Sequence, residues 1–449
     1  MAKVYIKETA YSVAEGTLLS EFLQQNGFAV SHPCGGRGSC GKCLVRVNGK
    51  EEKSCRYRIQ TDITVELPEA EAIYSPLQQA EGEASGLLAL DLGTTTLALA
   101  EVSAEGTPLR AVSSTNPQRR FGADVIARIE YCQKNDPALL QQVLLEELAE
   151  MLKGKEGHTL YVAGNTTMLH LLFGVDPTPM GAAPYTPAFL AQRQSCSLPL
   201  PVERVISLPG IAAFVGADIV AGLLMAEAPS EGHYNLLVDL GTNAEIVLFS
   251  RETALCTAAA AGPCFEGANI SCGMSASRGA VCSYSEEGYR TVGDAPAVGL
   301  CGTGLIDLIA TLVKEGTIDE TGYMEEDFEI APAVGLTPAD VRCFQLAKSA
   351  VCAAILTLME RAGVTTEQID TLYLCGGFSA AINRENAAAV GLFPAELCAK
   401  ASSLGNSSLG GTARYACGAE LPLFVKNAEY ADLSADPVFS DLFMENMMF

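Results

Sequence analysis

The sequence is poor in positive charge, and this shortage excludes one class of partner. Its 449 residues contain 29 Lys and Arg against 53 Asp and Glu, which gives a formal net charge of −24. Surfaces that bind phosphate backbones are rich in Lys and Arg, so we expect no nucleic-acid partner. The four histidines, at positions 32, 158, 170 and 233, form no cluster in the sequence and do not indicate a catalytic role.

Long apolar runs are also missing. No run approaches the roughly 18 apolar residues that a membrane span requires. The first residues alternate polar and apolar side chains like a strand, and they lack the apolar core of a signal peptide. Apolar residues still make up 49% of a chain long enough for more than one domain. We therefore expect a multidomain cytoplasmic protein that does not contact a membrane.

Paired cysteines are rare among the sixteen cysteines of the chain. The twelve from Cys132 to Cys417 contain no C-x-x-C pair, and we expect them to be reduced and mostly buried. The other four form a C-x5-C-x2-C-x11-C arrangement with glycines between the first three: Cys34, Cys40, Cys43 and Cys55. Thiolates in a glycine-rich loop can converge on one centre. The spacing favours a [2Fe–2S] cluster over a zinc site, whose ligands usually form two short C-x2–4-C knuckles.

The chain divides into segments of different composition. Residues 1–67 show short strands, a helix and the cysteine loop, whereas residues 68–86 are rich in Glu, Ala, Pro and Gly without an apolar period. We interpret those 19 residues as a linker, which could extend over about 60 Å. From residue 87 onward, apolar strands alternate with helical stretches as in α/β domains. We predict lobe I at 87–234, lobe II at 235–417 and a C-terminal tail at 418–449.

A strand that ends in an Asp-x-Gly-Thr turn occurs twice, at Asp91 and at Asp239, 148 residues apart. Such a turn can hold phosphate oxygens with N–H groups and hydroxyls while its carboxylate reaches a hydrated Mg²⁺. A single turn of this kind can be an ordinary strand end. Here glycine motifs follow at 302–304 and 376–378, so the repeat predicts two similar lobes that face each other across a cleft.

This order of motifs resembles the superfamily of sugar kinases, heat-shock chaperones and actin. The resemblance implies that Asp91 and Asp239 orient Mg²⁺ or the attacking water, with Glu245 as a weaker candidate. It also implies two phosphate turns, a connecting helix and a glycine pair against adenosine. The implied ATP-binding residues are Gly93, Thr94, Thr95, Thr96, Gly241, Thr242, Asn243, Gly302, Thr303, Gly304, Gly376, Gly377 and Phe378.

The cysteine loop CGGRGSCGKCLVRV resembles plant-type ferredoxins. The resemblance implies a β-grasp fold with a first strand at Val4–Lys7 and a helix at Leu18–Asn26. The first gap has five residues where plant ferredoxins have four. The last gap has 11 residues, as in the compact iron–sulfur subunits of molybdenum hydroxylases. Neither change removes a ligand, but together they leave the potential of the cluster open.

The two modules together resemble the ATP-dependent reductive activators of corrinoid proteins. Five further stretches carry the resemblance: Gly164–Met168, Phe214–Asp218, Ala261–Gly267, Ala347–Ser349 and Gly405–Leu409. The resemblance implies electron transfer from the [2Fe–2S] cluster to a corrinoid protein or methyltransferase, driven by ATP and Mg²⁺. It further implies an external reductant such as a ferredoxin or flavoprotein, and a homodimer. Longer family members insert a linker and a middle domain where this chain has 19 residues.

Three other functions stay open at this level. The protein could donate electrons to a non-corrinoid enzyme, act as a small-molecule kinase with a structural ferredoxin module, or switch binding partners with nucleotide. The segment Ala261–Ala280 is a candidate for sensing nucleotide or touching the partner, although a tightly packed loop would have the same composition. Cys264 and Cys272 lie in this segment, but they do not suggest a second metal site.

Overall fold

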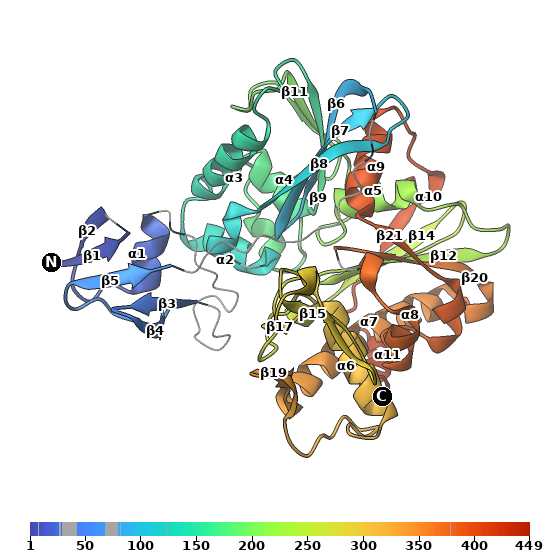
Figure 1. Cartoon of the computed structure of the whole chain (residues 1–449). Coiled ribbons are helices and arrows are strands. Elements are labelled where there is room, and N and C mark those ends of the chain that lie inside the picture. Colours follow the sequence, from blue (N-terminus) through green and yellow to red (C-terminus); the bar gives the residue numbers. More distant parts are fainter. Residues whose placement is uncertain are drawn as a thin grey trace.

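The computed structural model describes residues 1–449 except 8, 27, 29–42, 68–79, 81, 123 and 378. A small N-terminal module is followed by two larger α/β lobes, each built on a six-stranded sheet (Figure 1). This architecture confirms the predicted fold class. The cysteines at 34 and 40, the phenylalanine at 378 and most of the predicted linker lie outside the described residues.

The N-terminal module is a β-grasp sheet with the strand order β2-β1-β5-β3-β4 and one helix. Strand β1 pairs antiparallel with β2 and parallel with β5. Its alternating pattern buries Val4 and Ile6 against Leu19 and Phe22 of the helix. The predicted strand and helix agree with the observed elements to within two residues. The elements are β1 (Ala2–Ile6), β2 (Thr9–Val13), α1 (Leu19–Gln25), β3 (Leu44–Val47), β4 (Lys50–Lys53) and β5 (Ile63–Glu66).

The two lobes repeat one topology. The sheet of lobe I has the order β10-β11-β9-β6-β7-β8, and the sheet of lobe II has the order β21-β20-β12-β13-β14-β22. In each lobe an antiparallel meander of three strands comes first, and its first strand then pairs parallel with a later strand. The two Asp-x-Gly-Thr turns follow the equivalent strands β6 and β12, so the internal repeat seen in the sequence is a repeat of structure.

The strands of lobe I are β6 (Ala84–Leu92), β7 (Thr96–Ser103), β8 (Pro108–Thr115), β9 (Thr159–Gly164), β10 (Gln194–Ser195) and β11 (Arg204–Ser207). Its helices are η1 (Pro117–Arg120), α2 (Val125–Lys134), α3 (Ala138–Met151), α4 (Thr166–Leu172), η2 (Thr178–Gly181) and α5 (Ala217–Met225).

The main strands of lobe II are β12 (Tyr234–Leu240), β13 (Ala244–Phe249), β14 (Ala254–Ala259), β20 (Ile369–Cys375), β21 (Ala401–Gly405) and β22 (Ala428–Tyr430). Smaller strands are β15 (Ala280–Ser285), β16 (Gly288–Thr291), β17 (Gly299–Leu300), β18 (Phe328–Ala331) and β19 (Val334–Leu336). The helices are η3 (Pro263–Glu266), η4 (Val292–Asp294), α6 (Gly302–Lys314), α7 (Pro338–Ala362), η5 (Thr366–Gln368), η6 (Ser379–Ala381), α8 (Arg384–Ala389), η7 (Ala395–Lys400), α9 (Ser407–Ala416), α10 (Leu423–Lys426) and α11 (Pro437–Glu445).

Helices α5 and α9 lie between the lobes. Helix α5 follows a strand of lobe I and packs against both lobes, with Ala217 and Leu224 in the core of lobe I and Ile219 and Leu223 in the core of the lobe II sheet. Helix α9 follows a strand of lobe II but packs Leu409 and Ala413 against strands of lobe I. The two helices cross so closely that a Cβ atom on Gly411 would lie 1.7 Å from the carbonyl oxygen of Ala221. This crossing is therefore a tight joint between the lobes.

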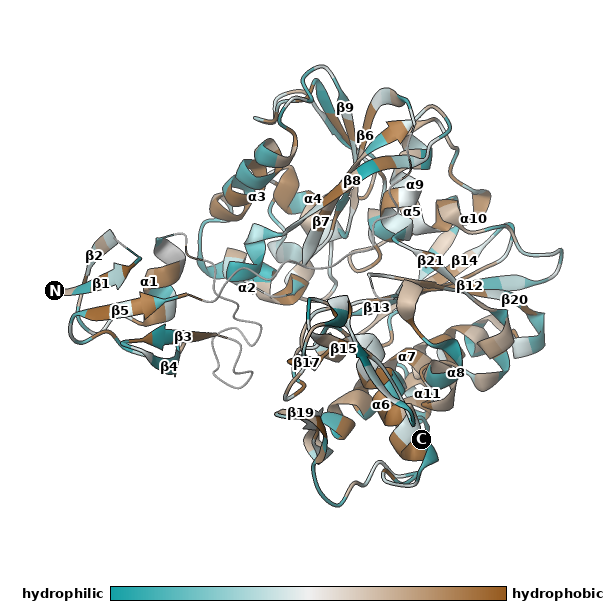
Figure 2. Cartoon of the chain, viewed as in Figure 1, coloured by the Kyte–Doolittle hydropathy of each residue, from teal (hydrophilic) through white to brown (hydrophobic). Residues whose placement is uncertain are grey.

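Helix α7 is the long buried helix of lobe II. Its length and composition would allow a membrane span, and it is the one such helix among the described residues, but 78% of its apolar window is buried inside the protein. A core helix passes the same test, so the helix is weak evidence for a membrane. Figure 2 shows hydrophobic colours gathered on the strands and helices in the interior of the lobe, which agrees with a core role.

Both ends of the predicted lobes differ from the prediction. Strand β6 begins at Ala84, inside the predicted linker, because this end pairs with β7 and the Ser85 hydroxyl donates to the Val102 carbonyl at 2.8 Å. The residues that we predicted as a tail, 418–449, instead belong to lobe II. They add β22 to its sheet and pack α11 against α7.

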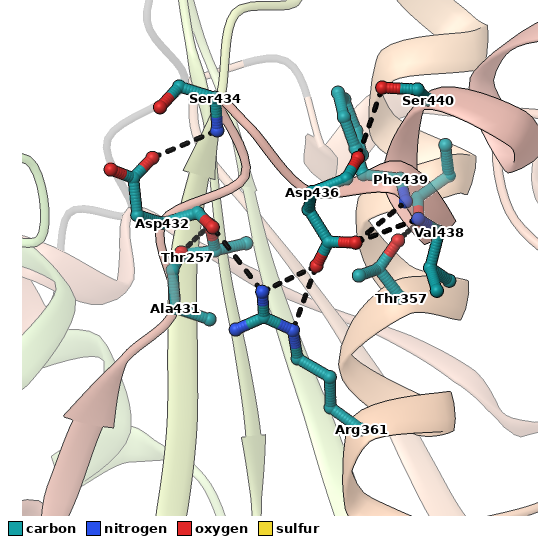
Figure 3. Close-up of polar contacts among 11 residues, drawn as sticks. Thr257, Thr357, Arg361, Ala431, Asp432, Ser434, Asp436, Val438, Phe439 and Ser440 are labelled. Carbon is teal, nitrogen blue, oxygen red and sulfur yellow. Dashed lines mark hydrogen bonds and ion pairs between the residues drawn. The ribbon is translucent and has the colours of Figure 1, made fainter.

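Arg361 of α7 fixes this C-terminal segment (Figure 3). Its guanidinium donates to the Asp436 carboxylate at 2.9 Å through Nε, and also to the carbonyl of Asp432. Thr257 of β14 donates to the carbonyl of Ala431 at 2.7 Å. Polar contacts between distant residues leave no apolar period in the sequence. The composition of residues 418–449 therefore did not predict that this segment packs on lobe II.

Candidate functional site

The two described cysteines of the cysteine loop converge. Cys43 lies directly before β3, Cys55 lies in the turn after β4, and both side chains are buried. Their sulfur atoms are 3.2 Å apart, farther than the about 2.05 Å of a disulfide bond. The Ser54 amide donates to the Cys43 carbonyl at 2.9 Å and holds the two segments together. Two buried thiols that meet in this way fit a shared iron–sulfur centre.

The first phosphate turn is held from three sides. The Gly93 amide donates to the Thr96 carbonyl at 3.1 Å, and a Cβ atom on Gly93 would lie 2.5 Å from that oxygen, so the turn requires glycine. Asn116 donates to the Gly93 carbonyl at 2.8 Å. Arg128 donates to the Thr94 carbonyl, and Asn165 donates to the Thr94 hydroxyl at 3.0 Å. These bonds fix the turn before any phosphate binds.

The carboxylate of Asp91 is held by helix α9. It accepts hydrogen bonds from Asn406 Nδ2 at 3.0 Å and from Ser408 Oγ at 2.8 Å. Asn406 is also the N-cap of α9, because its oxygen accepts from the Leu409 amide at 2.9 Å. Burial raises the pKa of Asp91, and the two hydrogen bonds oppose the rise. The first phosphate turn is thus joined to α9, the helix that follows strand β21 of lobe II.

The second phosphate turn repeats the first. The Gly241 amide donates to the Asn243 carbonyl at 2.9 Å, and the Thr242 hydroxyl donates to the Glu266 carboxylate. Beside the turn, Gly376 has a φ of +98°, and a Cβ atom on it would lie 2.5 Å from the Leu240 carbonyl oxygen. The glycine is therefore required by the approach of two backbones, whereas Gly377 faces open space.

Five carboxylates gather between the two turns: Asp91, Asp218, Asp239, Glu245 and Glu266. Burial, and then the charges of Asp218, Asp91 and Glu266, raises the pKa of Asp239 to about 7. Burial and the charge of Asp91 raise the pKa of Asp218 to about 7 as well. Glu245 lies opposite Asp239 in the β12–β13 register, and burial raises its pKa well above its ordinary value. A site with this excess of carboxylates favours a cation.

Two neighbouring arginines of lobe I lie beside this site, and Arg119 offsets part of the charge of Glu266. Arg128 is fully buried and donates to the Gly122 carbonyl at 3.0 Å. Burial and the neighbouring Arg119 lower the pKa of Arg128 to about 9. The guanidinium of Arg119 is also close enough to Glu266 to oppose the rise that burial causes in the pKa of that carboxyl. Arg119 has no hydrogen bond or ion pair with another described side chain.

The predicted site residues differ in what the structure shows of them. Gly302 and Gly304 begin α6, and Cβ atoms there would lie 2.1 Å from the carbonyl oxygens of Phe265 and Val281. Thr303 donates to the Cys282 carbonyl at 2.7 Å. These contacts give the three residues a packing role, and their role in ATP binding stays a prediction. Thr95 contributes its carbonyl, which accepts from the Asn116 amide at 2.9 Å.

The segment 261–280 is partly a packed loop and partly a neighbour of the cleft. Ser271 donates to Asp340 through its amide and its hydroxyl, at 2.7 and 2.5 Å. The thiol of Cys272 donates to the Gly335 carbonyl at 2.9 Å. Glu266, in contrast, bonds to the second phosphate turn. This carboxylate ties the segment to the predicted nucleotide site.

Sequence reasoning did not assign Asp218 and Arg119 to the cleft. Asp218 lies in the first turn of α5, at the position equivalent to Ser408 in α9, and the sequence signal was the repeat itself. No group of three or more His, Cys, Asp or Glu side chains in the described part of the chain is arranged as a ready metal site.

Three family models match the chain in sequence order. A 2Fe-2S iron-sulfur cluster binding domain matches residues 4–71, the RACo middle region matches residues 86–230, and the C-terminal ASKHA domain of RACo matches residues 233–449. The middle region therefore matches lobe I, which corrects our expectation that this chain has only a linker where longer family members carry a middle domain. These matches show a [2Fe–2S] domain and an actin-like ATPase domain in one chain.

Two curated proteins and one solved structure are similar to the chain. The corrinoid activation enzyme RamQ of Eubacterium limosum is 26% identical over 98% of both chains. A [Co(II) methylated amine-specific corrinoid protein] reductase of Methanosarcina barkeri is 31% identical over 46% of this chain and 43% of its own. The structure of a reductive activator for corrinoid, iron-sulfur protein superposes with a TM-score of 0.71 at 26% identity, covering 100% of this chain and 98% of the other.

Proposed function

Because the chain belongs to the RACo family of corrinoid activation enzymes, we propose that it is an ATP-dependent reductive activase of a corrinoid protein. It delivers single electrons to the cobalt of that protein and reduces cob(II) to cob(I). One observation carries the proposal: a converging cysteine pair and two lobes with paired Asp turns occur in the same chain. The names of both similar enzymes support a corrinoid substrate.

The iron–sulfur centre is held by Cys34, Cys40, Cys43 and Cys55. A [2Fe–2S] cluster bound there would carry one electron at a low potential, typically near about −400 mV in plant-type ferredoxins. The chain's own residues bury two of the four thiols and keep their sulfurs together. The Ser20 amide donates to the Ser54 carbonyl at 3.0 Å, which anchors the turn between β4 and Cys55 to the helix.

The cleft binds ATP between the two phosphate turns. We assign a hydrated Mg²⁺ to Asp91 and Asp239. Burial raises the pKa of both carboxyls, and neighbouring carboxylates add to the rise at Asp239, which a divalent cation would offset. Arg119 approaches from lobe I and neutralises charge on the terminal phosphate. Asp218 lies beside both aspartates and positions the attacking water. Because the nucleotide contacts both lobes, its binding favours the closed arrangement of the α5–α9 joint over an open one.

ATP is required because the electron moves uphill. Each 59 mV of one-electron mismatch corresponds to about 1.4 kcal/mol, so a gap of about 100 mV needs roughly 2.3 kcal/mol. The cleft supplies this energy by favouring one complex with the cob(II) protein and releasing the product after hydrolysis. We further propose a soluble ferredoxin or flavoprotein as the external reductant, a homodimeric assembly and a cytoplasmic location.

Two substitutions test the proposal by separating its halves. Cys40→Ser removes one cluster ligand, so we expect it to abolish electron delivery and leave ATP binding intact. Asp239→Ala should do the reverse, with a cluster that dithionite still reduces but no ATP-dependent reduction of the cob(II) protein. ATP-dependent reduction that persists in Asp239→Ala would contradict the assignment of the cleft. A phosphorylated small-molecule product would favour a kinase instead.

A further inference from the structure

The N-terminal module carries a positive face although the whole chain is strongly negative. Residues 43–60 contain five Lys and Arg and two Glu, whereas the complete chain has a net charge of −24. The five cations are exposed: Arg46, Lys50, Lys53, Arg56 and Arg58. A local reversal of sign on an acidic protein is an electrostatic signal for a partner of the opposite charge.

Part of this face is hollowed. We define the basic hollow by the residues that line it at β3, β4 and the segment after β4: Leu44, Glu51, Glu52, Lys53, Arg56, Tyr57, Arg58 and Gln60. Leu44 and Lys53 lie opposite each other in the β3–β4 register, and 40% of the Leu44 surface is exposed. This exposed apolar side chain lies among three cations and two carboxylates, so the hollow carries a small excess of positive charge. Figure 2 shows β4 in hydrophilic colours beside it.

The basic hollow lies next to the thiols. Leu44 directly follows Cys43, and Arg56 directly follows Cys55, whose sulfurs are 3.2 Å apart. A protein seated on the hollow would therefore touch the residues that adjoin two ligands of the iron–sulfur centre. Electron exchange between proteins requires a short separation between the redox groups, and the basic hollow combines such a position with positive charge.

We propose that the basic hollow is the docking site of an acidic one-electron carrier protein that reduces the [2Fe–2S] cluster, an inference that rests on the proposed function. The carrier loses one electron and the cluster gains one, and no bond or proton is exchanged. The acidic lobes of this chain do not occupy the hollow, because its side chains are exposed in the whole molecule. Delivery to the corrinoid protein must be controlled by the ATP cleft. The hollow belongs entirely to the N-terminal module and contains no residue of the ATP cleft. This location suits the reduction of the cluster by the carrier, a step that precedes ATP-controlled delivery.

The test uses the complete, cluster-loaded protein and a pre-reduced acidic plant-type ferredoxin as the probe. Stopped-flow absorbance follows reduction of the cluster at low and high salt, without ATP or corrinoid protein. The variants are Lys53→Glu and Arg56→Glu. The matched control is Lys3→Glu, which makes the same charge change at an exposed position of β1 in the same module. Reduction by dithionite verifies that each variant holds an intact cluster.

We expect both hollow variants to lower the second-order rate at low salt by about fivefold to tenfold and the control to change it by less than about twofold. High salt should remove the difference. Equal rates in Lys53→Glu and Lys3→Glu would overturn the proposal. So would unchanged carrier rates together with slower reduction of the cob(II) protein, because the hollow would then serve the acceptor. Failure of the proposed function would appear separately, as normal cluster reduction without ATP-dependent reduction of cobalt.

Discussion

Gly411→Ala should force helices α5 and α9 apart where they cross between the lobes. A Cβ atom there would lie 1.7 Å from the Ala221 carbonyl oxygen, about 1.5 Å closer than an ordinary contact allows. The obstacle is backbone, so α5 and α9 must separate. Overpacking typically lowers the stability of the folded protein by about 1–3 kcal/mol and occasionally more. The change from Gly to Ala in a helix stabilises the helix by about 1 kcal/mol. Gly410 supplies the matched control, because its Cβ atom would meet only the flexible end of Met225, at 3.1 Å.

The gain in helix propensity is the same in Gly411→Ala and Gly410→Ala. The difference between their free energies of unfolding therefore measures the cost of the steric clash alone. We expect Gly411→Ala to be less stable than Gly410→Ala by about 3 kcal/mol, or roughly 6–12 °C in the midpoint of thermal unfolding. Displacing α9 also moves Ser408 away from Asp91, so ATP turnover should fall in Gly411→Ala and persist in Gly410→Ala. Equal midpoints and equal turnover in the two variants would refute the reasoning.

Three further predictions concern the cleft and the C-terminal segment. The raised pKa of Asp218, about 7 in the folded protein, means that stability is lost as the pH rises from about 4 to about 7. Asp218→Asn should therefore stabilise the nucleotide-free protein on the order of 2–4 kcal/mol at pH 8 and far less at pH 4, measured by urea unfolding. Arg119→Ala should lower kcat for ATP hydrolysis about 10- to 100-fold with a smaller change in KM, whereas the exposed Arg110→Ala should not. Arg361→Ala should destabilise lobe II by about 1–3 kcal/mol in thermal unfolding, whereas Lys314→Ala, which breaks an ion pair on the surface, should leave the unfolding midpoint nearly unchanged.

Local chemistry explains which parts of the site could be predicted from the sequence. The turns after Asp91 and Asp239 depend on glycines within three residues of each aspartate, and the strand before each turn is a short apolar run. The cysteine spacing is local as well. These features need no knowledge of distant segments, and the fold class followed from their order.

The parts that were missed depend on distant segments. The bonds from Asn406 and Ser408 to Asp91 join residues more than 300 positions apart. They exist only because α9 crosses into the other lobe. Asp218 reaches the site through α5, which packs between the two lobes. The packing of the glycine at 302 against the Phe265 carbonyl and the docking of residues 418–449 also require the assembled lobe. Composition and periodicity carry no record of such contacts.

Reduction of cobalt by the intact protein tests the central claim most directly. Anaerobic, cluster-reduced protein is mixed with a cob(II) corrinoid protein, and the cobalt absorption is followed with Mg-ATP, with Mg-ADP and without nucleotide. The account predicts conversion to cob(I) with Mg-ATP alone, accompanied by oxidation of the iron–sulfur cluster. Equal conversion without nucleotide, or ATP hydrolysis that leaves cob(II) and the reduced cluster unchanged, would contradict it.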